Sequence, residues 1–220
     1  MKPDRQTQRG LFISLEGGDG VGKSTQFDLL CRALEARGWP VFPVREPGGT
    51  PIGEKVRAMI LDPANKEMAP AAEALLYAAS RAQLVGERIR PALAQGKLVL
   101  ADRYVDSSLV YQGHALGLGI EAVRGVNGFA TGGLLPDLTL LLDADPDRAM
   151  HNLTSARPSD RIERRESAYR RQVRQGYLAL AQADPRIKVI DAGRAIDDVH
   201  RDVLEGVLEF LKTRGRGVSS

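Results

Sequence analysis

The sequence contains four uninterrupted apolar runs, separated by segments with helical periodicity. The runs are LFISLEG (residues 11–17), KLVLADR (97–103), DLTLLLDA (137–144) and IKVIDA (187–192), and WPVFPVREP (39–47) is a fifth candidate. Runs without polar alternation are typical of strands covered by helices on both faces. Between them, residues 71–93 and 199–212 place apolar residues at three- and four-residue spacing. This alternation predicts an α/β fold with a doubly wound parallel sheet, whose ligands bind beyond the carboxyl ends of the strands.

Length and composition favour one domain over residues 1–220, because 220 residues with 43% hydrophobic and 27% charged side chains can bury a single large core. The polar ends, 1–10 and 213–220, are predicted to be loose tails. No apolar run reaches the roughly 18 residues of a membrane span, and the N-terminus lacks the apolar centre of a signal peptide, so we expect a cytoplasmic protein. A single cysteine excludes an internal disulfide, and the net charge of +3 is only a weak indication of anionic ligands.

The stretch SLEGGDGVGKST matches the P-loop pattern G-x-x-x-x-G-K-[ST] between an expected strand and an expected helix over 24–38. Glycines let backbone N–H groups turn towards phosphates, Lys23 can reach the outer phosphates, and Ser24 can bind Mg²⁺. The segment predicted to hold a nucleoside triphosphate is Gly17, Gly18, Asp19, Gly20, Val21, Gly22, Lys23, Ser24 and Thr25. The alternative is a glycine-rich turn without a ligand. A GTPase would carry N-K-x-D after a strand, and LLDADPD follows instead.

Two further strand ends carry arginine. Arg45 and Arg103 each come at or just after an apolar run, so they should meet at the same edge of the sheet. Paired guanidinium groups suit a phosphate monoester through forked hydrogen bonds, and Asp102 could position Mg²⁺ or its water shell. The alternative for each arginine is a surface ion pair.

Four motifs together, EGGDGVGKSTQ, REPGGTPIGE, DRYVDSSLVYQG and DRIE, resemble those of bacterial thymidylate kinases, in the same order and over nearly the whole chain. The resemblance implies a five-stranded parallel sheet flanked by helices, with a short mobile lid at about residues 152–164. It also implies transfer of the γ-phosphoryl group of ATP to dTMP with Mg²⁺, giving dTDP for dTTP synthesis, and a homodimer.

The resemblance assigns residues to the acceptor site. Asp19 is expected to meet the sugar 3′-hydroxyl, Tyr77 to stack on thymine, and Arg81 to donate to its O4 atom. The other expected dTMP contacts are Arg45, Arg103, Ser108 at the thymine edge, Tyr111 where a 2′-hydroxyl would lie, and Gln112 beside the base. From periodicity alone, Tyr77 and Tyr111 would be core aromatics.

Residues 157–174 hold seven arginines and three acids. Gly20 stands where other members of the resembled family carry a catalytic P-loop arginine, so the resemblance implies that the lid supplies this cation, through Arg161 or Arg157. Arg164, Arg165, Arg170, Arg171 and Arg174 are interpreted as a solvated helix face with ion pairs at four-residue spacing. Asp160 and Glu163 match the acidic lid positions, and Ala192 and Gly193 match a loop that passes the adenine.

Two alternatives stay open: another P-loop kinase for a deoxynucleotide or nucleoside, and a nucleotide-dependent nucleic-acid-binding or regulatory protein. A nucleoside kinase needs a general base for a neutral hydroxyl, whereas an acceptor phosphate is already anionic, so Arg45 and Arg103 favour a monophosphate. We expect ATP and dTMP as partners, and neither nucleic acid nor a membrane.

Overall fold

Five parallel strands form one sheet in the computed structural model of the chain, which describes residues 9–153, 160–163 and 165–215. The strands are β1 (Leu11–Gly17), β2 (Val41–Arg45), β3 (Leu98–Asp102), β4 (Leu138–Asp143) and β5 (Ile187–Asp191), in the order β2-β3-β1-β4-β5. Leu15 of β1 is opposite Asp102 of β3, and Gly17 is opposite Leu142 of β4. The predicted doubly wound parallel sheet is confirmed, including the strand in WPVFPVREP. Burial on both faces holds for the central strands only, since the edge strand β5 exposes Lys188 and Val189.

Helices connect all the strands. They are α1 (Lys23–Glu35), α2 (Pro51–Leu61), α3 (Pro70–Leu84), α4 (Arg90–Ala94), α5 (Val105–Ser108), α6 (Ile120–Thr131), α7 (Pro146–Leu153), α8 (Ser167–Ala183) and α9 (Ile196–Thr213), with π-helical segments η1 (Val85–Ile89) and η2 (Leu109–Ala115). The helix expected over 71–93 is therefore α3, η1 and α4 in succession. Pro91 has no N–H to donate within a regular helix, and the wider π turn directly precedes it.

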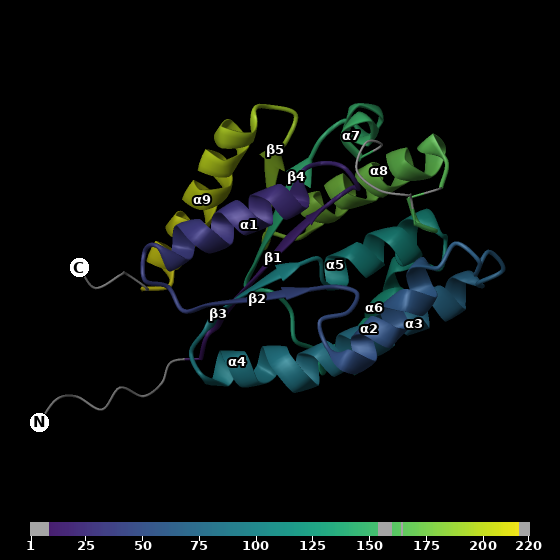
Figure 1. The fold of residues 1–220 in the computed structure, drawn as a ribbon, viewed down its shortest axis with the longest axis horizontal. Coiled ribbons are helices and arrows are strands. Elements are labelled where there is room, and N and C mark those ends of the chain that lie inside the picture. The colour runs from purple at the N-terminus through teal and green to yellow at the C-terminus, as the bar shows by residue number, and fades with distance from the viewer. Residues whose placement is uncertain (1–8, 154–159, 164, 216–220) are drawn as a thin grey trace, which may run out of the picture.

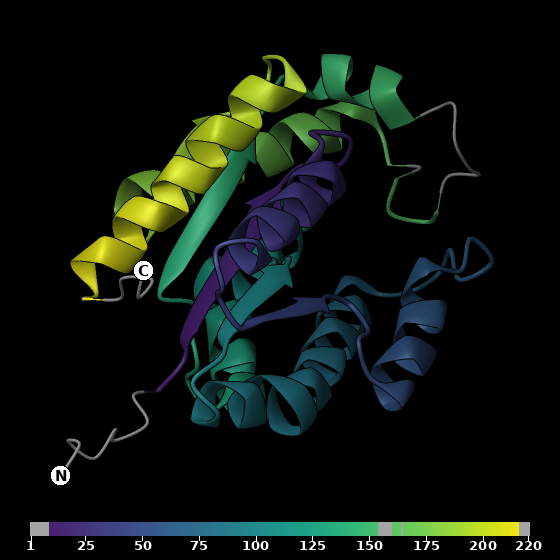
Figure 2. The ribbon, with the colours of Figure 1, turned by 60° about the vertical axis from the view of Figure 1, so that its left-hand side comes forward.

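Two apolar layers cover the sheet. Leu98 and Leu100 of β3 face the layer formed by α1 and α9, while Val99 and Ala101 face the layer formed by α3, α4, η2, α6 and α8. This alternation has the period of two that a strand requires. Figures 1 and 2 show α1 and α9 lying side by side over one face of the sheet.

The carboxyl ends of the strands form one rim. Short backbone bonds extend the pairing beyond the strands: Glu46 N–H donates to Asp102 O at 3.0 Å, Arg103 N–H to Leu15 O at 3.0 Å, and Ala192 N–H to Asp143 O at 2.8 Å. The segments that follow β2, β3 and β5 thus begin at this rim. Within the described part of the chain, no helix is both long and apolar enough to cross a bilayer.

Candidate active site

The P-loop occupies the turn from β1 into α1, as its sequence predicts. Gly17 has φ of 145°, and a Cβ atom there would lie 2.5 Å from the carbonyl oxygen of Leu142 in β4. Gly22 has φ of 89° and caps α1, whose first turn contains no acidic side chain. A side chain would be strained at both positions, so glycine is needed for the turn, and the helix terminus presents free N–H groups to an anion.

Lys23 is almost fully enclosed at the start of α1. Its Nζ atom donates to the carbonyl oxygen of Gly18 at 2.5 Å, and only 8% of the residue is exposed. Burial, and then the positive charge of Arg103, lower the pKa of Lys23 to about 8. An anion between the two cations would relieve both effects.

Arg103, Asp19 and Tyr111 form a cluster at the same rim. The Arg103 guanidinium donates to Asp19 Oδ1 at 2.6 Å and to Gly17 O at 2.9 Å, and it lies 5.2 Å from the centre of the Tyr111 ring. The Tyr111 hydroxyl donates to Asp19 Oδ2 at 3.3 Å. Arg103 has a left-handed backbone with φ of 70°, the only such non-glycine residue in the described ranges. Strain of this kind concentrates at functional sites, and here it aims the arginine back at the P-loop.

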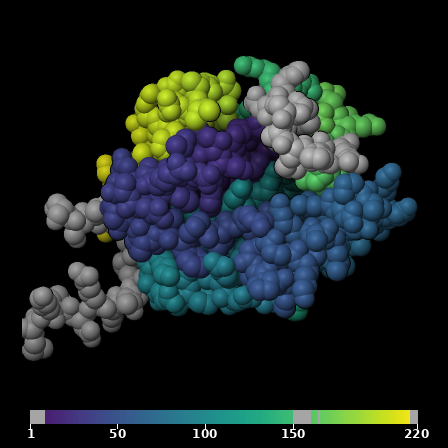
Figure 3. Space-filling model, viewed as in Figure 1, coloured from purple at the N-terminus to yellow at the C-terminus, as the bar shows by residue number. Residues whose placement is uncertain are grey.

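One cavity of about 720 Å³ joins most of the expected site residues. It is lined by Asp19, Gly20, Val21, Gly22, Lys23, Ser24, Thr25, Arg45, Tyr77, Arg81, Asp102, Arg103, Ser108, Tyr111, Gln112, Asp160, Glu163 and Ala192. In Figure 3 the surface is recessed between the purple segment of the P-loop and α1 and the blue segment around α2. Gly17, Gly18, Gly193 and Arg161 do not line it, and Arg157 lies outside the described residues.

Arg45 is joined in the cavity by Arg57, which sequence reasoning missed. Arg45 donates to Glu54 Oε1 at 2.8 Å, and its side chain is 49% exposed. Arg57 donates to Pro47 O at 2.9 Å, and burial, followed by the charge of Arg45, lowers its pKa. The available signal was the spacing in REPGGTPIGEKVR: α2 starts at Pro51, and Arg57 is two turns further along it.

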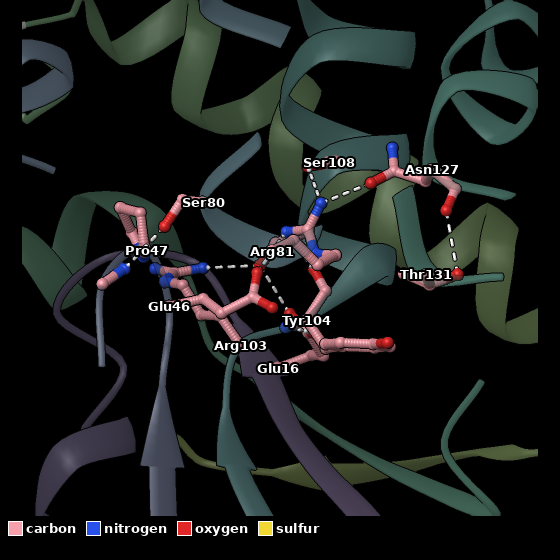
Figure 4. A network of polar contacts seen from close by, with 12 residues as sticks. Glu16, Glu46, Pro47, Ser80, Arg81, Arg103, Tyr104, Ser108, Asn127 and Thr131 are labelled. Atoms are coloured by element: carbon pink, nitrogen blue, oxygen red, sulfur yellow. Dashed lines mark hydrogen bonds and ion pairs between the residues drawn. The ribbon is translucent and has the colours of Figure 1, made fainter. Parts of the chain in front are cut away.

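Arg81 also lines the cavity and is buried in a polar network (Figure 4), with 1% of it exposed. Nη1 donates to Ser108 Oγ at 2.9 Å and Asn127 Oδ1 at 2.5 Å, and Nη2 donates to Tyr104 O at 3.1 Å. Nη2 also lies 2.5 Å from Glu46 Oε2, which balances the charge. Burial raises the pKa of Glu46 to about 7 against the opposing effect of Arg81. Sequence reasoning missed Glu46, although it sits within REPGG, and Asn127, for which no motif gave a signal.

Gln112 reaches the cavity beside this network. Its Nε2 atom donates to Glu73 Oε1 at 2.9 Å, and the residue is 2% exposed. The carboxylate can only accept, so the amide nitrogen must face Glu73 and the amide oxygen must face away from it. Glu73 was not predicted as a site residue.

Arg161 points to Glu73 and not into the large cavity. Its Nη2 atom donates to Glu73 Oε2 at 2.6 Å and its Nε atom to Ile60 O at 2.8 Å. Arg165 Nη2 donates to the same carboxylate oxygen at 2.6 Å. Arg161, Arg165 and Glu73 line a separate cavity of about 380 Å³, next to Lys66 and Met68.

The expectation of ion pairs at four-residue spacing is wrong for Arg165, Arg171 and Arg174, although Arg171, with its side chain 54% exposed, does lie on a solvated face. Arg165 pairs with Glu73, Arg171 with Asp147, and Arg174 with Asp143 through two bonds of 2.8 Å. Asp147 and Asp143 lie in α7 and β4, which pack against α8, and Glu73 lies in α3. Arg170 donates to a backbone oxygen, that of residue 165, and Arg164 lies outside the described residues.

The expected Mg²⁺ ligands have suitable chemistry. Ser24 and Asp102 both line the cavity, and Asp102 Oδ1 is buried without a hydrogen-bond partner. Mg²⁺ prefers one or two protein oxygens together with water and substrate phosphates. No group of three His, Cys, Asp or Glu side chains that could hold a metal occurs in the described residues, so this pair with a bound triphosphate fits the ion better than a protein cage would.

Comparison with known proteins identifies the group to which this site belongs. The sequence model of the family described as thymidylate kinase matches residues 15–203. The chain is 50% identical over 211 residues to the thymidylate kinase of Symbiobacterium thermophilum, covering 96% of this chain and 98% of that protein. It is 50% identical over 213 residues to that of Pelotomaculum thermopropionicum, covering 96% and 99%. The thymidylate kinase of Deinococcus radiodurans is 48% identical over 202 residues, covering 91% and 98%.

Proposed function

The chain belongs to the thymidylate kinase family and phosphorylates dTMP. We propose that both substrates bind in the 720 Å³ cavity, with ATP at the P-loop and dTMP at Arg45, Arg57 and Arg103. The observation that supports this arrangement is that the P-loop and a group of arginines line one cavity. In this proposal the P-loop and Lys23 form one anion site, and Arg45, Arg57 and Arg103 supply the other.

The donor side binds the triphosphate and prepares it for transfer. Backbone N–H groups of residues 17–25 surround the phosphates, and Lys23 leaves the Gly18 oxygen to reach the outer ones. An oxygen of the dTMP phosphate then attacks the γ-phosphorus atom, and the bond to the β-phosphate oxygen breaks, releasing ADP. The attacking oxygen is already anionic, so no general base is needed, and catalysis depends on position and positive charge. Ala192 and Gly193, in the loop after β5, are proposed to lie beside the adenine.

Ser24 and Asp102 are the residues proposed to hold Mg²⁺, directly or through water. The ion supplies charge neutralisation for the phosphate oxygens during transfer. The unpaired Oδ1 atom of Asp102 supports this assignment.

The acceptor side recognises the sugar and the phosphate. Arg103 and Arg45 contact the phosphate monoester, and the carboxylate of Asp19 accepts from the 3′-hydroxyl. Tyr111, held against Asp19 and Arg103, fills the space that a 2′-hydroxyl would need. This arrangement favours a deoxynucleotide.

The base is read by an aromatic ring and a set of polar atoms. Tyr77 stacks on thymine, Arg81 and Ser108 lie at its O4 edge, and the Gln112 amide oxygen accepts from N3–H. Cytosine has an unprotonated N3 atom and an amino group in place of O4. Its N3 acceptor would face the Gln112 amide oxygen, which is also an acceptor, and its amino donor would face the Arg81 guanidinium, which is also a donor. Sites built around such hydrogen bonds reject the mismatched analogue by about 10⁴-fold.

The catalytic lid cation expected from the resemblance stays a prediction for Arg157 or Arg161. Arg161 would have to leave Glu73 to reach the phosphates, since its guanidinium is committed there in this structure.

We further propose a cytoplasmic homodimer. Met59 of α2, Leu75 of α3 and Phe129 of α6 are 53%, 58% and 93% exposed, and α3 packs against both α2 and α6. Exposed apolar side chains on adjacent helices are suited to an interface between copies. Light scattering after size exclusion tests this, and Phe129→Glu should give a monomer.

The assignment of substrates is tested by ADP release coupled to NADH oxidation, with dTMP, dUMP, dCMP and thymidine as acceptors. We expect dTMP to be preferred, dUMP to lose about 10–200-fold for its missing methyl group, and dCMP and thymidine to be nearly inactive. Equal use of dCMP and dTMP would refute the base contacts, and efficient use of thymidine would refute the phosphate clamp.

A further inference from the structure

Glu73 is a fully buried carboxylate that binds three side chains from different parts of the chain. It lies in the first turn of α3 and is 0% exposed. Oε1 accepts from Gln112 in η2, and Oε2 accepts from Arg161 and Arg165, all at 2.6–2.9 Å. A buried carboxylate is costly unless it is paired, and here two guanidinium groups more than balance its charge.

The two arginines are themselves fixed, so they hold the carboxylate in one orientation. Arg161 donates to Ile60 O, and its backbone N–H donates to Leu61 O at 3.2 Å. The Arg165 guanidinium lies 4.5 Å from the centre of the Tyr169 ring and donates to the Tyr169 hydroxyl. Oε2 is therefore committed to cations, and Oε1 is the oxygen presented to Gln112.

This arrangement decides which end of the Gln112 amide faces the base. Because Oε1 can only accept, the Gln112 nitrogen turns to Glu73 and the amide oxygen is left for the cavity, without a partner among the described residues. Glu73 itself lines the smaller cavity and not the large one, so it acts through Gln112.

We propose that Glu73, held by Arg161 and Arg165, is a positioning residue that orients the Gln112 amide and thereby sets the preference for a base with N3–H. The proposal rests on the base contact assigned to Gln112 above. It gives Arg161 and Arg165 a role in choosing the acceptor base, which is separate from any role in phosphoryl transfer.

The decisive variant is Glu73→Gln, which keeps the shape but replaces one oxygen by an NH₂ group. The two guanidinium groups can only donate, so they retain the remaining oxygen and leave the NH₂ group facing Gln112. Gln112 then turns its oxygen towards residue 73 and its own nitrogen towards the base. We expect kcat/KM for dTMP to fall at least tenfold, mainly through KM, while that for dCMP does not fall, so the dTMP/dCMP ratio drops at least tenfold.

Arg165→Met is the second variant, for the case that Glu73→Gln does not fold, because it keeps the Glu73 carboxylate and its pair with Arg161. The dTMP/dCMP ratio of kcat/KM for Arg165→Met should also fall, by about threefold or more. Arg171→Met is the matched control, since Arg171 pairs with exposed Asp147 and its side chain is 54% exposed. We expect an unchanged ratio for the control.

The dTMP/dCMP ratio of kcat/KM is measured first for the wild type, and it tests the contact between Gln112 and the base independently of Glu73. If the wild type prefers dTMP and the variants lose activity on dTMP and dCMP by the same factor, Glu73 is only structural and the proposal is wrong. An unchanged ratio in folded Glu73→Gln would overturn it equally.

Discussion

Glu46 provides a test of how its buried ion pair with Arg81 affects the stability of the folded protein. Its carboxyl group lies 2.5 Å from Arg81, both side chains are at most 2% exposed, and burial raises the pKa of Glu46 from 4.5 to about 7. The folded protein therefore binds more protons than the unfolded chain between these pH values. The contribution of Glu46 to the free energy of unfolding should therefore fall as pH rises through this window, because it is complete below 4.5 and is lost above 7.

Glu46→Gln removes this titration and keeps the side chain's volume. At about 1.4 kcal/mol for each pH unit, the pKa change from 4.5 to about 7 corresponds to at most about 3.5 kcal/mol. The difference in unfolding free energy, wild type minus variant, should therefore decrease by about 1–3 kcal/mol from pH 4.5 to pH 8. Glu16, whose pKa burial also raises to about 7, titrates in both proteins and cancels in the difference.

The assay is urea unfolding followed by circular dichroism at pH 4.5, 5.5, 6.5, 7.5 and 8, at constant ionic strength. Glu209→Gln is the control, because Glu209 is an exposed partner of Lys188, and the hydrogen bond and the charge of Lys188 lower its pKa, so its titration moves away from this pH range and not into it. A difference for Glu46→Gln that stays constant with pH, or that increases, would show that the attraction of Arg81 outweighs the cost of burial and would refute the reasoning.

Two further predictions concern the transfer step. Lys23→Ala should lower kcat by at least 10²–10³, with dTMP affinity and fold retained, because the lost contact is to the ATP phosphates; turnover near the wild-type level in single-turnover phosphoryl transfer would reject the P-loop assignment. An arginine that stabilises the transferred group is worth about 10³–10⁵ in kcat, so Arg157→Ala or Arg161→Ala should reach that loss if either is catalytic. Since Arg161 is bound to Glu73, we expect Arg161→Ala to lose less kcat than Arg157→Ala. Arg170→Ala is the control. If neither Arg157→Ala nor Arg161→Ala loses more kcat than Arg170→Ala, the catalytic cation comes from outside the lid.

The strands and the P-loop could be predicted because their signals are local. Buried central strands need continuous apolar residues, and the β1 turn needs glycine at Gly17 and Gly22, so both features appear in short stretches of sequence. The π-helical segments gave no such signal, because they are only five and seven residues long and contain too few apolar side chains to distinguish the spacing of a π turn from that of an α-helix.

Glu73 and Asn127 could not be predicted, because their partners are far away in the sequence. Glu73 is 88 residues from Arg161 and 92 from Arg165, and an acid in the first turn of a helix is ordinarily a solvated residue. Asn127 likewise reads as a polar residue on an amphipathic helix, until α6 packs against α3 and brings it to Arg81. Local periodicity cannot distinguish a solvated polar side chain from one that meets a buried partner.

The cations that line the cavity differ in whether they already form an ion pair with an acidic side chain. Glu46 balances Arg81, Asp19 pairs with Arg103, and Glu54 pairs with Arg45. Among the described residues that line the cavity, Lys23 and Arg57 have no ion-pair partner, and they come from the two elements, α1 and α2, on either side of it.

Arg57 should therefore contribute more than Arg45 to binding the dTMP phosphate, because it does not have to break an ion pair with a described residue in order to bind the ligand. It is also the less exposed of the two and is less screened by solvent, while Arg45 is 49% exposed and must exchange Glu54 for the ligand. We expect Arg57→Met to weaken dTMP binding by about 10–100-fold, at 1.5–3 kcal/mol for a charge-assisted bond, and Arg45→Met to weaken it less. Calorimetric titration of dTMP into each variant measures this, with thymidine as the ligand that lacks the phosphate. An equal effect of Arg57→Met on thymidine would assign Arg57 to the nucleoside, and a larger loss for Arg45→Met would show that the pair with Glu54 does not decide which arginine binds the phosphate.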